Sequence, residues 1–231
     1  RVVEAGWGGG GFARHMARRF GVEVTACNIS AEQIRFARER AELAGLSDRV
    51  RYIEEDYRNI EGEFDAFVSV GMLEHVGPAQ YERLGETIDR CLKPGGLGLI
   101  HTIGRNDKAT MNPWIERRIF PGAHPPSLKE MMAIFEPNSF SVLDVENLRL
   151  HYRETTAHWL KNFEEHADEV RDMFDEEFVR TWRLYLAGST CTFDIGRLQL
   201  FQVLFSRERN NDVPLTRRDI YTDEEPIRAF T

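Results

Sequence analysis

The stretch Val2-Val3-Glu4-Ala5-Gly6-Trp7-Gly8-Gly9-Gly10-Gly11, at the start of the 231-residue chain, decides the fold class. A short apolar run leads directly into glycines, and apolar residues then recur at helical spacing: Phe12, Ala13, Met16, Ala17 and Phe20. This order predicts a strand, a glycine loop and a helix. A glycine-rich turn lets the backbone approach a nucleotide closely, and the first N–H groups of the helix favour anionic or polar ligand groups.

The segments that follow continue the same alternation of strand and helix. Residues 22–27 alternate as a second strand, and Ser30 caps a helix that ends at Gly45. Apolar runs at 50–53, 64–70 and 97–103 are separated by polar, helix-like stretches, and a turn is expected at 93–96. We therefore predict an α/β, Rossmann-like fold: a seven-stranded, mostly parallel sheet with helices on both faces. Residues 140–150 form a further strand, and 198–206 form the last, reversed one.

Composition excludes several classes of protein. The 42% of hydrophobic residues are enough for a core, and the net charge of -8 argues against nucleic acid as a partner. Three cysteines without C-x-x-C spacing argue against a disulfide framework or a zinc site, so no metal is expected. No apolar run reaches the roughly 20 residues of a membrane span, and no signal peptide opens the chain. We expect a cytoplasmic protein.

Two long segments depart from the βα pattern. Residues 104–126 are rich in proline, glycine and aromatic residues, which is typical of a lid or a substrate wall. Residues 152–188 belong to one or two helices that carry many aromatic side chains. We predict that both segments form the substrate region.

The residue that follows the second strand separates two classes of nucleotide-binding enzyme. A dinucleotide-binding domain is expected to carry Asp or Glu there, whereas this strand ends in Thr25-Ala26-Cys27-Asn28. Glu4 instead resembles the acidic residue that opens the glycine motif of class I S-adenosylmethionine-dependent methyltransferases. The remaining alternative is a glycine turn that only packs a helix on a strand.

Four further segments resemble motifs of the cyclopropane-fatty-acyl-phospholipid synthase family, which includes the mycolic acid cyclopropane synthases. They are VSVGMLEHVG at 68–77, HTIG at 101–104, PWI at 113–115 with IFP at 119–121, and NISAEQ at 28–33. The resemblance implies a methyltransferase catalytic domain over residues 1–207, followed by a C-terminal tail at 208–231. Members of that family usually carry more chain upstream, and we expect that part to be missing here.

The resemblance also implies an activity and its residues. The methyl(ene) group of S-adenosylmethionine is transferred to the double bond of an unsaturated phospholipid acyl chain, and a bicarbonate ion acts as base in forming the cyclopropane. By resemblance the catalytic residues are Glu74, which accepts and orients, His101 and Tyr152, which donate, and the backbone of Ile103. The cofactor residues implied in the same way are Glu4, Ala5, Gly6, Gly8, Asn28, Ile29, Gln33, Asp56 and Tyr57.

Partners and alternatives remain open at this stage. Trp114, Ile115, Ile119 and Phe120 flank Arg117 and Arg118, a mixture that suits an interfacial lid but also a simple roof over the site. The resemblance favours a protein peripheral to the inner face of the membrane, and it allows a homo-oligomer. Two other functions are kept: a methyltransferase that makes a methylene or methyl-branched lipid or methylates a small amine, and a non-catalytic S-adenosylmethionine-binding module.

Overall fold

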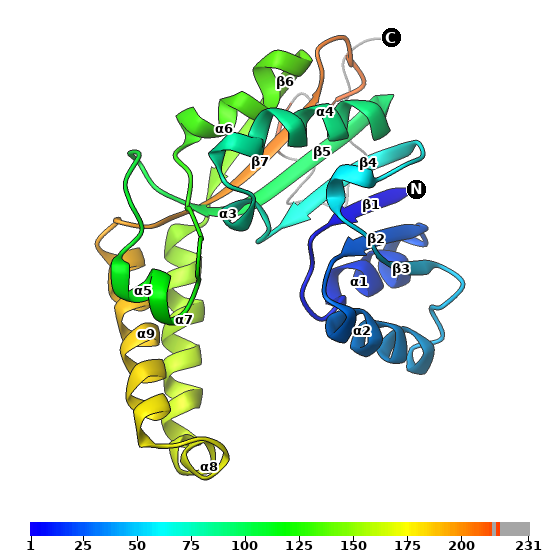
Figure 1. The fold of residues 1–231 in the computed structure, drawn as a ribbon. Helices are drawn as coiled ribbons and strands as arrows, with labels where there is room; N and C mark the ends of the chain where they lie inside the picture. The colour runs from blue at the N-terminus through cyan, green and yellow to red at the C-terminus, as the bar shows by residue number, and fades with distance from the viewer. Residues whose placement is uncertain (214–215, 218–231) are drawn as a thin grey trace.

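A computed structural model describes residues 1–213 and 216–217, and in it seven strands form one sheet in the order β3-β2-β1-β4-β5-β7-β6 (Figure 1). Strands β1 to β5 run parallel, whereas β7 is antiparallel to both β5 and β6. The predicted seven-stranded sheet with a reversed last strand is confirmed. The strands are β1 (Val2–Ala5), β2 (Val24–Asn28), β3 (Val50–Glu54), β4 (Phe64–Val70), β5 (Leu92–Gly104), β6 (Phe140–Asn147) and β7 (Gln199–Arg207).

Helices cover both faces of the sheet, as predicted. On one face α1 (Gly11–Phe20) and α2 (Ala31–Leu43) bury small residues such as Ala17 and Ala37 against β1 and β2. On the other face α4 (Tyr81–Cys91) and α6 (Leu128–Phe135) bury Ile88 and Met131. Several short elements lie between these strands and helices: α3 (Leu73–Val76), α5 (Pro113–Arg118), and the 3-10 turns η1 (Tyr57–Asn59), η2 (Pro78–Gln80) and η3 (Glu136–Asn138).

Three boundaries differ from the sequence prediction. The turn expected at 93–96 lies within β5, because Leu92 already pairs with Phe64 and the register shifts between Phe64 and Ala66. Strand β6 ends at Asn147, and the helix that follows begins at Arg149 rather than at 155. The helical region comprises three helices, α7 (Arg149–Glu165), α8 (Ala167–Met173) and α9 (Glu176–Asp194). Much of the predicted C-terminal tail falls outside the described residues.

Helices α7 and α9 form a hairpin that projects away from the sheet, with α8 at its tip (Figure 1). The hairpin has a small core of its own, built around Phe163, Val179 and Leu186. Helix α5 lies beside α9: Arg118 pairs with Glu177 at 3.4 Å, and the Phe120 and Tyr185 rings meet edge to face at 5.8 Å. Among the described residues no helix is long and apolar enough to span a bilayer.

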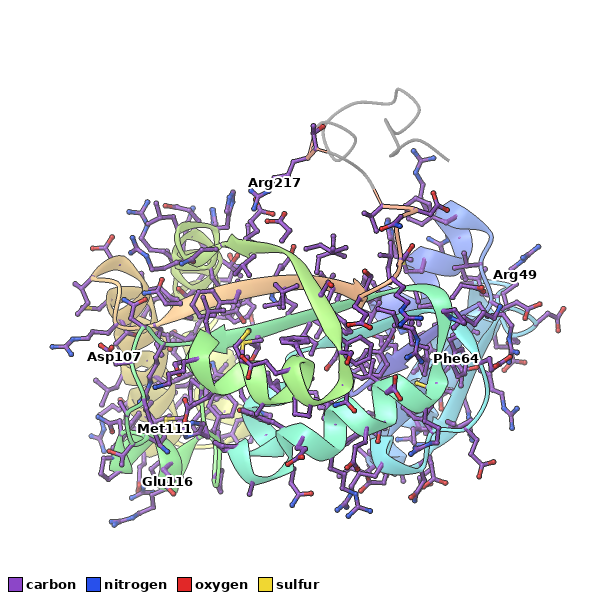
Figure 2. The ribbon with its side chains drawn as sticks, turned by 90° about the horizontal axis from the view of Figure 1, so that it is seen from above. Arg49, Phe64, Asp107, Met111, Glu116 and Arg217 are labelled. Carbon is purple, nitrogen blue, oxygen red and sulfur yellow. The ribbon has the colours of Figure 1, made fainter. Side chains whose placement is uncertain are left out.

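Strand order decides where a ligand can bind. Strands β1 and β4 are neighbours at the centre, and the chain winds outward from them in opposite directions. In open α/β sheets the crevice at such a switch point, outside the carboxyl ends of the strands, is the usual ligand site. Asp107, Met111 and Glu116, in the segment after β5, lie at the end of the molecule opposite Arg49 and Phe64, which mark the amino ends of β3 and β4 (Figure 2).

Candidate active site

A cavity of about 550 Å³ lies outside the carboxyl ends of β1, β2 and β4. Seven of the nine cofactor residues implied by the sequence line it, and two do not: Glu4 and Ala5 are buried in β1. The seven lining residues are Gly6, Gly8, Asn28, Ile29, Gln33, Asp56 and Tyr57.

The glycine loop has the backbone conformation that its sequence suggests. Gly6 has φ +69°, and a Cβ atom placed there would lie 2.6 Å from Cβ of Met72, so no other residue fits without strain. Asn28 fixes the loop to α2, because its amide NH2 group donates to the Trp7 carbonyl and, at 2.7 Å, to Oε1 of Gln33. The hydrogen bonds of Asn28 therefore hold the loop in one conformation, with its backbone facing the cavity.

The far side of this cavity is formed by the turn after β3. The Asp56 carboxylate caps η1 by accepting from the Arg58 N–H at 2.9 Å. The Arg58 guanidinium also donates to it, at 2.8 and 2.6 Å, and these contacts lower the pKa of Asp56. Tyr57 lies beside it, and burial raises the pKa of its phenol. The two residues thus present a fixed carboxylate and an aromatic ring to a ligand.

Glu4 lies beneath the loop and is almost fully buried. Its Oε2 atom has no hydrogen-bond partner within the described structure. Burial raises the pKa of Glu4 to about 7. A ligand group that donates a hydrogen bond or carries positive charge at this point would satisfy the carboxylate.

The raised pKa of Glu4 predicts a pH-dependent stability for the ligand-free protein. The folded state favours protonated Glu4, so the contribution of Glu4 to the free energy of unfolding is fully present below pH 4.5. It should decrease by up to about 3 kcal/mol as the pH rises through 7. Urea unfolding at pH 5 and pH 8 measures this decrease, which Glu4→Gln should largely remove. An equal decrease in both proteins would show that Glu4 titrates normally.

A second, larger cavity of about 1020 Å³ adjoins the first, and Val70, Gly71 and His75 line both. All four catalytic residues implied by the sequence line this second cavity: Glu74, His101, Ile103 and Tyr152. They come from α3, from β5 and from α7, which are far apart in the sequence. The fold therefore brings the expected set together, directly next to the nucleotide-type cavity.

Glu74 is held rigidly at the floor of this cavity. Its Oε1 atom accepts from the Ile103 N–H at 2.6 Å, whereas its buried Oε2 atom has no partner in the described structure. Burial raises the pKa of Glu74, and hydrogen bonds from the backbone and from the Thr102 hydroxyl partly oppose this shift. The Ile103 N–H is thus engaged in positioning Glu74, and the free oxygen is an acceptor.

His101 is neutral and has a fixed tautomer. Burial lowers its pKa, and the amide NH2 group of Gln202 donates to its Nδ1 atom at 3.1 Å, so the proton is on Nε2. The two residues face each other in the β5·β7 register. Gln202 was missed in the sequence analysis, although a polar residue inside the apolar strand 198–206 was a usable signal.

Tyr152 lies in the first turn of α7, between two aromatic rings. Its ring meets Phe193 at 5.0 Å and Trp159 at 5.7 Å, both edge to face, and burial raises its pKa to about 12. Its phenol is therefore a donor at neutral pH. The wall opposite includes Tyr185, which the sequence analysis did not single out as a site residue.

The segment 104–126 covers the larger cavity. Trp114, Ile115 and Phe120 line it, while Arg117 and Arg118 are exposed. The Phe120 ring meets His75 at 5.9 Å and Tyr185 at 5.8 Å, so it spans from α3 to α9. These side chains thus cover the cavity, and the contact of the segment with a membrane stays a prediction.

The described residues hold no group of three or more His, Cys, Asp or Glu side chains suited to a metal ion. The arrangement offers a glycine-lined cavity beside a larger one whose lining includes many aromatic and aliphatic side chains. One carboxylate, one imidazole and one phenol line the larger cavity, those of Glu74, His101 and Tyr152. Such a site can bind a nucleotide-like ligand next to an apolar one and can accept or donate protons between them.

Comparison with known proteins agrees with this reading. The family model described as mycolic acid cyclopropane synthetase matches residues 1–203. The chain is 38% identical to a cyclopropane-fatty-acyl-phospholipid synthase of Escherichia coli K12, over 94% of this chain and 56% of that protein. It is 34% identical to the tuberculostearic acid methyltransferase UfaA1 of Mycobacterium tuberculosis, over 90% of this chain and 50% of that protein.

Among solved structures, the cyclopropane synthase MmaA2 of Mycobacterium tuberculosis superimposes with a TM-score of 0.83 at 21% identity. The match covers 89% of this chain and 77% of that one, and it supports the fold alone. The chain spans about half the length of the curated relatives quoted above.

Proposed function

The chain belongs to the mycolic acid cyclopropane synthetase family, and from this premise we propose that it transfers the methyl(ene) group of S-adenosylmethionine to the double bond of an unsaturated phospholipid acyl chain. The observation that carries the proposal is the pair of adjoining cavities. The smaller one is lined by the glycine loop and by Asn28, Gln33 and Asp56, and the larger one includes apolar side chains such as Trp114, Ile115 and Phe120. Glu74 lines the larger cavity, next in the chain to His75, which lines both. This is the arrangement that a methyl donor and an acyl chain require.

The smaller cavity fits S-adenosylmethionine on three observations. The Gly6 backbone leaves room for close approach, Asn28 and Gln33 offer amide groups for ribose hydroxyls, and the Glu4 carboxylate, two residues before Gly6 and outside the lining, is buried with one oxygen that lacks a partner in the described structure. When bound, the sulfonium supplies an electrophilic methyl group. Asp56 and Tyr57 would then hold the adenine. The chain's own contribution is to fix this ligand with its reactive end toward Gly71 and His75, which line both cavities.

An alkene is a weak nucleophile, so the chain must exclude water and hold the double bond close to the methyl donor. Trp114, Ile115 and Phe120 close the larger cavity from one side, and the hairpin closes it from the other. The Tyr152 ring lies on the wall, where its π face can stabilise positive charge that develops on the acyl chain.

Ring closure requires loss of a proton from the transferred methyl group, and we propose bicarbonate as the base that accepts it. The donor set fits a small anion: Tyr152 and the Nε2–H of His101 line the cavity as donors, and the free Oε2 atom of Glu74 can accept from the bicarbonate hydroxyl. Ile103 supports this set indirectly, through its hydrogen bond to Glu74.

A branched product is the second candidate. The match to a tuberculostearic acid methyltransferase favours it, since the same transfer step followed by a different fate of the cation gives a methylene or methyl branch. On the present proposal, a ring forms when the bicarbonate beside Glu74 takes the proton from the transferred methyl group, and a branch forms when the proton is lost elsewhere.

The test uses the full-length protein. Calorimetry with S-adenosylhomocysteine measures cofactor binding, and mass spectrometry of unsaturated phospholipids after incubation with S-adenosylmethionine should detect a mass gain of one methylene unit. Proton NMR of the acyl chain then separates a ring from a methylene branch. Binding without any lipid product would favour a non-catalytic binding module, and methylation of a small amine would contradict the lipid assignment.

The lid arginines provide a test of membrane contact. Because Trp114, Ile115 and Phe120 face the cavity, we propose that attraction to an anionic leaflet rests on Arg117 and Arg118, at about 1 kcal/mol for each nearby charge. Replacing both by Glu should reduce sedimentation with anionic vesicles while cofactor affinity stays unchanged.

Arg118 also pairs with Glu177, so the double variant removes an ion pair as well as two charges. The control is the charge swap Arg118→Glu with Glu177→Arg, which restores the pair. Vesicle binding that is equally strong in the Arg117→Glu/Arg118→Glu variant and the unchanged protein would place the membrane contact elsewhere.

A further inference from the structure

Two arginines line the larger cavity without an acidic partner. Arg105 is half-buried; its guanidinium donates to the Thr110 carbonyl at 2.8 Å and contacts Sδ of Met111 at 3.7 Å. Arg197 is exposed at the same cavity and makes no side-chain hydrogen bond or ion pair within the described residues. Within the described residues these are the two arginines that line this cavity, and neither has a carboxylate partner there.

The sheet register brings these two residues to the same place. The antiparallel pairing of β5 with β7 ends at Gly104 opposite Gln199. Arg105 directly follows Gly104, and Arg197 precedes Gln199 by two residues, so both leave the sheet at one end of the paired strands. The backbone N–H of Arg197 donates to the Thr192 carbonyl at 2.9 Å, which holds its turn against the end of α9. Both residues line the larger cavity, and we call the part of the lining that they form the rim.

Burial separates the charged groups of the cavity. Glu74 is buried, and apolar side chains such as Met111, Ile115 and Leu184 also line the cavity. Arg105 is half-buried and Arg197 is exposed. Asp107 also lines this rim, exposed, and no ion pair joins it to either arginine in the described part of the chain. Burial lowers the pKa of Arg105, as expected for a guanidinium that lacks a counter-charge.

A cavity that combines apolar side chains with two guanidinium groups lacking a carboxylate partner matches an amphiphile with an anionic head. We propose that Arg105 and Arg197 bind the phosphate of the substrate lipid's headgroup while its acyl chain occupies the cavity. Guanidinium groups hold phosphate oxygens through charge-assisted, often bidentate hydrogen bonds. This inference rests on the proposed function. It predicts that Arg105 and Arg197 make the protein prefer lipids that carry a phosphate over uncharged lipids.

The preference of the protein for a phospholipid over an uncharged lipid tests the role of the two arginines. In mixed micelles of a neutral detergent, kcat/KM of the full-length protein is determined for a phosphatidylglycerol and for a diacylglycerol that carry the same unsaturated chains. Arg105→Gln and Arg197→Gln should each lower the ratio of the two values by about 10-fold. The control is Arg19→Gln on α1, an exposed arginine of equal charge away from both cavities, which should leave the ratio unchanged.

A binding experiment separates this inference from the proposed function. Calorimetry compares lysophosphatidylglycerol below its micelle concentration, the matching monoacylglycerol and inorganic phosphate. The lysophospholipid should bind more tightly than either of the others, and Arg197→Gln should remove the difference. Because the Arg197 side chain makes no contact to lose, that variant should keep the thermal stability of the parent protein.

The outcomes distinguish the two proposals. If no lipid is methylated but the lysophospholipid still binds through Arg197, the proposed function fails and the headgroup site stands. If phosphatidylglycerol and diacylglycerol lose kcat/KM equally in both variants, the headgroup site is wrong. Inorganic phosphate that binds as tightly as the lysophospholipid would also overturn it, because the site would then recognise free phosphate.

Discussion

Glu74→Gln is expected to lower the turnover of lipid by at least about 100-fold, which is the usual scale for a positioned acid–base group. The affinity for S-adenosylhomocysteine should stay nearly unchanged. Glu74 lines the larger cavity but not the smaller one. Gln can still accept from the Ile103 N–H, but an NH2 group then replaces the free, buried oxygen that accepts a hydrogen bond. Steady-state kinetics and calorimetry measure the two effects separately.

A matched variant controls for the loss of one negative charge. Glu116→Gln on α5 removes an exposed carboxylate that makes no contact in the described structure (Figure 2), and it should leave turnover unchanged. If Glu74→Gln weakens cofactor binding as much as turnover, Glu74 belongs to the cofactor site instead.

The pH dependence of activity tests the same residue. Because burial raises the pKa of Glu74, the carboxylate becomes protonated at a higher pH than an ordinary glutamate would. Activity of the unchanged protein should therefore fall as the pH decreases through this raised pKa. The residual activity of Glu74→Gln should lack this acidic limb.

Gly6→Ala is expected to cost about 3 kcal/mol of stability and to abolish measurable cofactor binding. The left-handed backbone at φ +69° costs a residue with a side chain about 1–2 kcal/mol, and the clash of its Cβ atom with Cβ of Met72 adds a similar amount. For a chain of this length the melting temperature should fall by about 10 °C. The loop also shapes the smaller cavity, so S-adenosylhomocysteine should no longer raise the melting temperature.

Gly11→Ala is the control, because it changes the same kind of residue five positions further on. Its φ is not positive, a Cβ atom there meets nothing within 4 Å, and Gly11 does not line the smaller cavity. Alanine also suits the first turn of α1, so this variant should be as stable as the parent or slightly more stable. Similar losses in both variants would mean that any change in the glycine loop is harmful and that Gly6 has no special role.

Local patterns in the sequence were enough to predict the architecture. The run 2–11 and the alternation of apolar strands with amphipathic helices follow from side-chain periodicity, which depends only on neighbours in the chain. The reversed last strand and the helices on both faces were predicted in the same way and are confirmed. Family resemblance, rather than periodicity, supplied the four candidate catalytic residues, and their roles remain predictions.

Only the tertiary structure decided which of these residues lie close together and which hydrogen bonds and protonation states they have. Glu74 bonds to the backbone 29 residues away, and Gln202 fixes the tautomer of His101 across 101 residues. Strand order and register create both contacts, so the polar Gln202 inside an apolar strand could mark a site residue but could not name its partner. The same register brings Arg105 and Arg197 to the ends of paired strands at one cavity, where neither has an acidic partner within the described residues. Burial and pairing depend on how the chain packs. The sequence was therefore enough to identify the candidate residues, whereas packing determined their pKa values and their hydrogen-bond partners.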